Sequence, residues 1–178
     1  MSDTLSIKKL EVNFNGTLVT STNLVPFTVP LVLKEAIDLA AGTGADAVNL
    51  CYMAEATLAT LTAVNLDLSG ALLTPTGAAC VFAKVRAFII YLHPGANMGP
   101  LLVGGHATAA FANWITSADT LANDQPKVRI RNGASGGLFM LTGTDVTGFA
   151  VTATTADLLT LYNEGSATCT FDIVILGA

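Results

Sequence analysis

The side chains that could carry out acid–base or metal chemistry are few, and their spacing along the chain forms no known motif. Both histidines fall in expected turns, because His93 directly precedes Pro94 and His106 follows two glycines. Neither has an aspartate or glutamate at the spacing of a known metal or catalytic motif. We therefore expect both to be loop histidines without a catalytic role, and we expect no metal site.

The carboxylates give no clearer indication of an active site. Four of them lie in or beside expected turns, where aspartate commonly binds nearby backbone: Asp145, Asp157, Glu164 and Asp172. A glycosidase would need two carboxyl groups about 5–10 Å apart across a cleft, and nothing in the sequence favours such a pair. The stretch Thr142–Asp145 lacks the clustered aspartates of a calcium loop. We expect no catalytic residue, no cofactor and no enzyme activity.

Neither the cysteines nor the glycines form a recognisable binding motif. Cys51, Cys80 and Cys169 are far apart, and each has apolar neighbours. No Cys-x-x-Cys or Cys/His spacing suggests zinc, so we expect buried free thiols, with a disulfide or a reactive thiol as the alternative. The glycine turn at residues 42–44 is not a dinucleotide loop, because Ala47 stands where the fingerprint needs a further glycine.

The composition instead indicates a protein that works by contact. The chain has 178 residues, of which 52% are hydrophobic and only 12% are charged, whereas an ordinary soluble domain is about a quarter charged. A surface so poor in charge is expected to be covered in a homo-oligomer or a larger assembly. A membrane span is not expected, because Lys84 and Arg86 interrupt the richest apolar window, residues 78–92.

The charge distribution also limits the partners. The net charge is −5 and there is no basic cluster, so binding to nucleic acid has no electrostatic basis. Residues 1–10 lack the order of a secretory signal, and we expect the chain to be kept in a cytoplasm or released without a signal. Lys127–Arg131 alternates basic and apolar residues, which indicates a solvated edge strand or a contact to an acidic partner. Trp114, beside Phe111, is expected in the core, with an interface anchor as the alternative.

Two apolar runs are predicted to be the strands around which the chain is organised. Val81–Leu92 and Cys169–Leu176 are rich in Val, Ile, Phe and Tyr, which fit a half-buried sheet. We expect them to be central strands of one antiparallel core. Lys84 and Arg86 should mark the end of the first strand that leaves the core for solvent or a partner.

The first forty residues are predicted to begin with a short hairpin. Leu5–Phe14 and Thr17–Thr20 flank an Asn15-Gly16 pair, which is a strong hairpin turn signal. Pro26 and Pro30 mark a loop or an edge strand, because proline cannot donate to a strand ladder.

The next stretches are also expected to be strands. Leu31–Ala41 fits a helix or a strand, and the all-β context favours the strand. Two further strands are expected at Asp46–Ala54 and Thr57–Leu68, joined by residues 54–56. Turn-rich residues follow at 69–70 and 74–77.

The remainder is predicted to be a meander of short strands. They are expected at Leu101–Val103, Lys127–Arg131, Leu138–Thr142, Gly148–Thr152 and Asp157–Tyr162. Turn residues recur about every ten residues, as in sandwiches and barrels. The predicted fold is all-β, an antiparallel β-sandwich in a single domain of residues 1–178, with residues 1–30 as an extended arm or hairpin.

Four stretches in the last hundred residues follow one recognisable pattern. They are FAKVRAFIIYLHP at 82–94, LLVGGHATAAFANWI at 101–115, GGLFMLTG at 136–143, and GFAVTATTADLLTLYNEGSATCTFDIVILGA at 148–178. The last is the most specific, with ADLLTLYNEG followed by an FDIVILG ending. Over residues 80–178 the chain resembles a group of β-sandwich virion proteins of tailed bacteriophages.

This resemblance implies a jelly-roll-like sandwich on a phage particle. The implied role is a capsid decoration (cement) protein, with a receptor- or glycan-binding head-fibre or tail component as the alternative. The implied partners are the major capsid protein and further copies of the chain, and three-fold packing of jelly rolls on shells favours a homotrimer by analogy. None of the four stretches is catalytic, so the resemblance assigns no functional residue.

Overall fold

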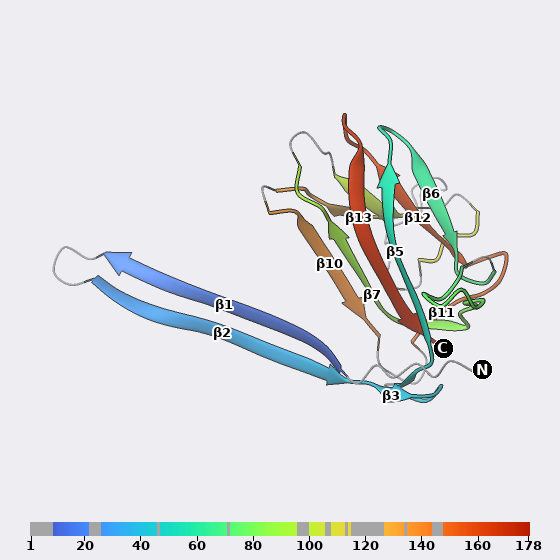
Figure 1. Cartoon of the computed structure of the whole chain (residues 1–178), viewed down its shortest axis with the longest axis horizontal. Helices are drawn as coiled ribbons and strands as arrows, with labels where there is room; N and C mark the ends of the chain where they lie inside the picture. The colour runs from blue at the N-terminus through green and yellow to red at the C-terminus, as the bar shows by residue number, and fades with distance from the viewer. Residues whose placement is uncertain are drawn as a thin grey trace.

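Two antiparallel sheets pack face to face as a sandwich, and a long two-stranded hairpin projects from it (Figure 1). The computed structural model describes residues 9–21, 26–45, 47–70, 72–95, 100–105, 108–112, 114, 127–133, 135–143 and 148–178. The predicted all-β, antiparallel sandwich is confirmed. Within these ranges, no helix has the length and hydropathy that crossing a membrane requires.

The first sheet contains the two apolar runs as neighbours. Its strand order is β10-β7-β13-β5, and β11 also pairs with β7. The bounds are β5 Leu50–Leu58, β7 Lys84–Leu92, β10 Gly137–Thr142, β11 Phe149–Ala150 and β13 Cys169–Gly177. β7 and β13 lie in the middle of the sheet, so their prediction as central strands is confirmed.

The second sheet has the order β6-β12-β8-β9. Its strands are β6 Ala63–Asp67, β8 Leu101–Gly104, β9 Lys127–Ile130 and β12 Leu158–Asn163. The basic strand β9 lies at the edge, as predicted, and its two basic side chains are exposed.

The core lies between the sheets and follows from the two-residue alternation of the strands. On β13, Phe171, Ile173 and Ile175 point inward and are at most 1% exposed, while the residues between them lie on the outer face. The indole of Trp114 meets the ring of Phe88 edge-on, with centroids 5.0 Å apart. The predicted core role of Trp114 is therefore confirmed.

The predicted exit of Lys84 and Arg86 from the core is wrong for Arg86. Arg86 is fully buried, and its Nη2 donates to the Gly44 carbonyl at 2.6 Å. Lys84 donates from Nζ to the Thr43 carbonyl at 2.8 Å. The β7–β13 register shifts between Leu176 and Gly177, which adds a residue to β7 and breaks the expected alternation of its faces.

The segment that receives these bonds covers one end of the sheet's outer face. It contains the short parallel pair β3 Ala40–Ala41 and β4 Ala47–Val48. Leu39 and Val48 pack on Ala87 and Leu176 in a small second core. Arg86 is therefore enclosed by a segment that lies about forty positions earlier in the chain.

The predicted turn at Asn15-Gly16 is wrong. β1 Lys9–Ser21 runs straight through it and pairs with β2 Pro26–Asp38. Apolar residues continue at every second position from Leu10 to Leu18, with Gly16 as the only break. A single uninterrupted strand keeps all of these residues on one face, whereas a turn at Asn15-Gly16 would separate them. The strand preferred for residues 31–41 is confirmed as far as Asp38, and residues 5–8 lie outside the described ranges.

The predicted connection at residues 54–56 is also wrong. β5 continues through these residues and pairs with β13 from Leu50 to Leu58. The connection to β6 instead lies at residues 59–62, where Leu61 adopts a φ of 54°.

Candidate functional site

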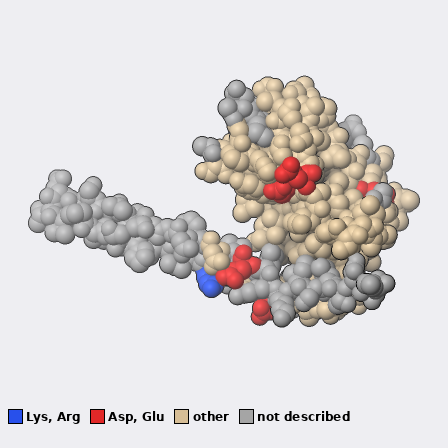
Figure 2. Space-filling view, viewed as in Figure 1, with Lys and Arg blue, Asp and Glu red and all other residues tan. Residues whose placement is uncertain are grey.

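The outer face of the five-stranded sheet is the most distinctive surface of the sandwich. Large apolar side chains lie on it and are exposed, with Met53 at 58%, Leu138 at 69% and Tyr91 at 37%. Ile89, Met140 and Val174 are partly buried between them. Figure 2 shows this face as almost free of charged atoms apart from an acidic patch near its middle. We call this surface the outer face.

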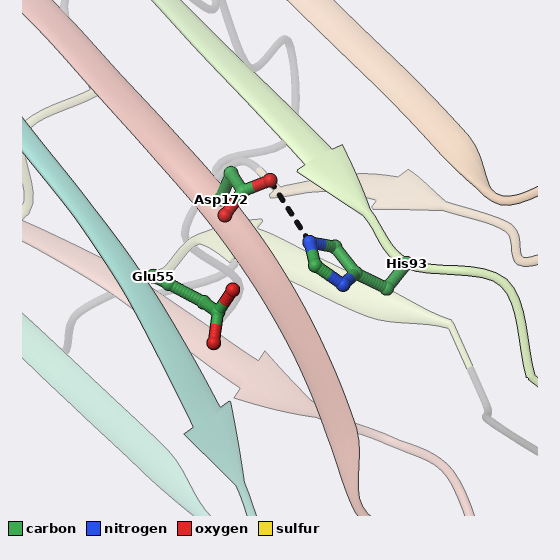
Figure 3. A group of neighbouring side chains, drawn as sticks. All are labelled: Glu55, His93 and Asp172. Atoms are coloured by element: carbon green, nitrogen blue, oxygen red, sulfur yellow. Dashed lines mark hydrogen bonds and ion pairs between the residues drawn. The ribbon is translucent and has the colours of Figure 1, made fainter.

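The acidic patch belongs to a cluster of three side chains, Glu55, His93 and Asp172, drawn in Figure 3. Glu55 of β5 and Asp172 of β13 are direct cross-strand partners. The His93 Nε2 lies 2.9 Å from Asp172 Oδ2. One ligand atom from each residue lies within 4.8 Å of the other two, so the three groups converge on one point of the outer face.

Strand geometry positions all three residues. Glu55 and Asp172 alternate with inward-facing neighbours, which places both on the outer face. His93 follows the last residue of β7, and its backbone N–H still donates to the Thr170 carbonyl at 2.9 Å. The ring of Tyr91 lies 5.4 Å from the His93 ring. The imidazole is thus held beside β13 by backbone pairing and ring contact.

The electrostatics of the cluster are unusual for so apolar a surface. Two like charges facing each other across adjacent strands repel. Among the described residues the Glu55 side chain has no hydrogen-bond or ion-pair partner, and the Asp172 carboxylate pairs with His93 and with no Lys or Arg. Within the part of the chain that the structure describes, His93 is the one side chain paired with either carboxylate. The cluster is therefore suited to accept a cation.

This cluster was not predicted from the sequence. Asp172 was expected in or beside a turn, but it lies within β13, so that prediction was wrong. His93 was expected to be a loop histidine with no carboxylate at motif spacing, and its partner lies 79 positions away in the chain. The alternation of β13 gave a usable indication, because it puts Asp172 on the face opposite Phe171 and Ile173.

The other predicted carboxylates have structural partners. Asp157 is buried and accepts from Ser69 Oγ at 2.8 Å and from the Thr154 N–H at 2.7 Å. Glu164 forms a 2.8 Å ion pair with Arg129 on the edge strand β9. His106, Thr144 and Asp145 lie outside the described residues.

The three cysteines are free thiols, as predicted. Cys80 and Cys169 are fully buried, whereas Cys51 is partly exposed, contrary to the expectation of burial. Burial, with a smaller contribution from Cys51, raises the pKa of the Cys80 thiol to about 11. Burial also raises the pKa of Cys51 and Cys169, so all three resist becoming nucleophilic thiolates.

Comparisons with known proteins give no family assignment: no protein-family model, no curated protein and no solved structure matches the chain.

Proposed function

We propose that the protein is a structural component of a phage virion, most specifically a capsid decoration protein that works through protein–protein contacts. In this proposal copies of the chain form a homo-oligomer, a trimer by preference, which binds the major capsid protein on the particle. The observation that carries the proposal is the β1–β2 hairpin and the distribution of residue types along it.

The register of the hairpin separates its residues into two unlike faces. On one face, every position is apolar except Gly16, Thr20 and Glu35. The apolar positions are Leu10, Val12, Phe14, Leu18, Phe27, Val29, Leu31, Leu33 and Ile37. The other face is mostly polar and includes the ion pair between Lys34 and Glu11, at 3.3 Å. We call the first set the apolar hairpin face.

A hairpin of this kind needs a partner. An isolated two-stranded hairpin is at best marginally stable in water, and a third strand or a packing surface stabilises it. With 13 residues in each strand the hairpin is roughly 40 Å long, and it projects away from its own sandwich (Figure 1). A neighbouring molecule is the partner that this geometry favours.

The outer face offers a matching surface on such a neighbour. It is a sheet with exposed Met53, Leu138 and Tyr91, and sheets pack on one another through apolar faces at about 10 Å. In the proposed oligomer the apolar hairpin face of one copy packs on the outer face of the next. This accounts for the low share of charged residues, 12% of the chain.

The strand pairing supports the jelly-roll part of the proposal. A jelly roll has eight strands in two sheets, wound so that the first strand pairs with the last and the pairing continues inward. Here β5 pairs with β13, β6 with β12, β7 with β10 and β8 with β9. The two sheet orders, β10-β7-β13-β5 and β6-β12-β8-β9, follow from that winding.

Two experiments test the proposal. Mass spectrometry of purified particles of the phage that encodes the chain should detect it as a stoichiometric component. Light scattering should give an oligomeric mass for the wild type and a monomeric mass for Phe14→Asp, which places a charge on the apolar hairpin face. The matched control is Asn15→Asp, the next residue on the opposite face, which should leave the mass unchanged.

Absence of the chain from the particle would contradict a virion role. Equal masses for Phe14→Asp and the wild type would contradict assembly through the hairpin. Binding to defined sugars on a glycan array, without binding to capsid shells, would instead favour the receptor- or glycan-binding alternative.

A further inference from the structure

We propose that Glu55, His93 and Asp172 form a binding site for a divalent transition-metal cation of the zinc class on the outer face. The inference does not depend on the virion role, because it rests on the residue types, their convergence and their charge.

The residue types define the class of cation. Zinc is bound by imidazole nitrogen and carboxylate oxygen at about 2.0–2.2 Å, usually with tetrahedral geometry. The imidazole favours this class of ion, whereas calcium and magnesium prefer oxygen ligands alone. Three protein ligands leave one tetrahedral position open to water or to a group from another molecule.

The distances fit with small side-chain movements. Ligand atoms around a tetrahedral zinc ion are about 3.3–3.6 Å apart, given those bond lengths. His93 Nε2 and Asp172 Oδ2 are already 2.9 Å apart, and all three ligand atoms lie within 4.8 Å. Glu55 is exposed, so its side chain can rotate to close the remaining gap. Figure 3 shows the Glu55 and Asp172 carboxylates and the His93 ring turned toward one another.

The backbone holds the ligands in place before any cation binds. Glu55 and Asp172 sit opposite each other in a continuous ladder that runs from Leu50 to Leu58 on β5. The His93 N–H is bonded to the Thr170 carbonyl. Because the backbone at these positions is already fixed by pairing between adjacent strands of one sheet, cation binding costs little backbone entropy.

The local charge provides the driving force. In the cation-free protein, two carboxylates face each other at a position where like charges destabilise a sheet. A divalent cation would neutralise both carboxylates and leave the imidazole neutral, which is the form that binds metal.

Isothermal titration of the full chain with zinc chloride tests the site. Cys51 is partly exposed on the same sheet and could bind zinc itself, so a Cys51→Ser background serves as the parent protein. The parent should bind one equivalent of zinc. Glu55→Gln, His93→Gln and Asp172→Asn should each weaken binding by at least about 10- to 100-fold, because that is the loss that follows even when only an outer-shell partner of a ligand is removed. Glu164→Gln, which removes a carboxylate outside the cluster, should leave the affinity unchanged.

Thermal unfolding gives a second readout. Zinc should raise the unfolding temperature of the parent by mass action and leave that of the Glu55→Gln/His93→Gln double variant unchanged. Circular dichroism without zinc establishes that the variants are folded. Equal zinc affinity for the parent and the double variant would overturn the proposal, and so would equal affinity of the parent for calcium and zinc.

Discussion

Arg86 donates a hydrogen bond from Nη2 to the carbonyl of Gly44 at 2.6 Å, across two segments that are 42 positions apart. The guanidinium is fully buried although it carries a charge. Buried charges are costly unless they are hydrogen-bonded. The bond therefore fixes the segment that joins the hairpin to the sandwich against the end of β7.

Replacing Arg86 with alanine should lower the free energy of unfolding by about 2–4 kcal/mol. The change leaves a cavity where the aliphatic stem packs and removes the donor from the Gly44 carbonyl. Urea unfolding followed by circular dichroism measures the change. Lys84→Ala removes the neighbouring bond to Thr43, which is exposed, and should change stability by less than about 0.5 kcal/mol. Similar losses for both variants would show that burial of Arg86 is not the cause.

Asn163→Ala should also be strongly destabilising. The buried Asn163 Nδ2 donates to the carbonyls of Leu58, Ala59 and Ala167, and its Oδ1 accepts from the Gly165 N–H. Removing the amide leaves these buried backbone groups without a hydrogen-bond partner from residue 163, and the free energy of unfolding should fall by roughly 2–4 kcal/mol. In Asn65→Ala only an exposed bond to Thr160 is lost, so its unfolding midpoint in urea should stay close to that of the wild type.

Thr154→Gly should stabilise the protein by about 1 kcal/mol. Thr154 has a φ of 68°, in the left-handed region that β-branched residues avoid. The Thr154 side chain is exposed. The hydrogen bond from residue 154 to the Asp157 carboxylate is donated by the backbone N–H, so glycine at this position keeps it. Thr155→Gly, at the next position, should instead lose about 0.5–1 kcal/mol through added freedom of the unfolded chain. Destabilisation in both variants would contradict the assignment of strain to Thr154.

Stability should fall at alkaline pH in part because of Cys80. Its pKa is raised from 9.0 to about 11 by burial. Between these values the unfolded chain releases the thiol proton while the folded chain retains it, so the free energy of unfolding decreases as pH rises. Unfolding curves at pH 8 to 11 measure the decline. The decline should be shallower in Cys80→Ala, and identical pH profiles would exclude the thiol as a contributor.

Glu55→Gln should raise stability in the presence of a chelator. The change removes one of two like charges that face each other across β5 and β13, which is worth roughly 0.2–1 kcal/mol. The gain should shrink in high salt, because screening weakens repulsion between exposed charges. Glu164→Gln breaks the ion pair with Arg129 and should give no such gain. A gain independent of salt would point to a cause other than charge.

Much of the sandwich could be predicted because its strongest strands are defined by local sequence. β7 and β13 are runs of Val, Ile and Phe, which fit a half-buried sheet wherever the partner strands come from. The prediction of a turn at Asn15-Gly16 was wrong because longer-range pairing overrides the local signal there. The dipeptide is a local signal, but the apolar alternation of Phe14, Gly16 and Leu18 continues through it, and pairing with Val32 and Leu31 keeps the strand extended.

The candidate site could not be predicted in the same way, because it depends on strand register. Glu55 meets Asp172 only when β5 pairs with β13 in one alignment, and no spacing within either segment encodes that alignment. The burial of Arg86 depends on the register shift beside Gly177 and on a covering segment that precedes β5. Both features are long-range consequences of packing.

The two prolines of β2 give the hairpin two unlike edges. Pro30 pairs with Thr17 and Pro26 with Ser21, and proline has no N–H to donate, so these are pairs whose backbone groups point away from the partner strand. The outer edge of β2 therefore lacks a backbone N–H donor at Pro26 and Pro30. On the outer edge of β1, every residue whose backbone groups point away from β2 has an N–H donor, from Lys9 to Ser21. A strand from another molecule can extend the hairpin along β1 but not along the first part of β2. Any growth of the hairpin into a larger sheet is thereby directed to one side.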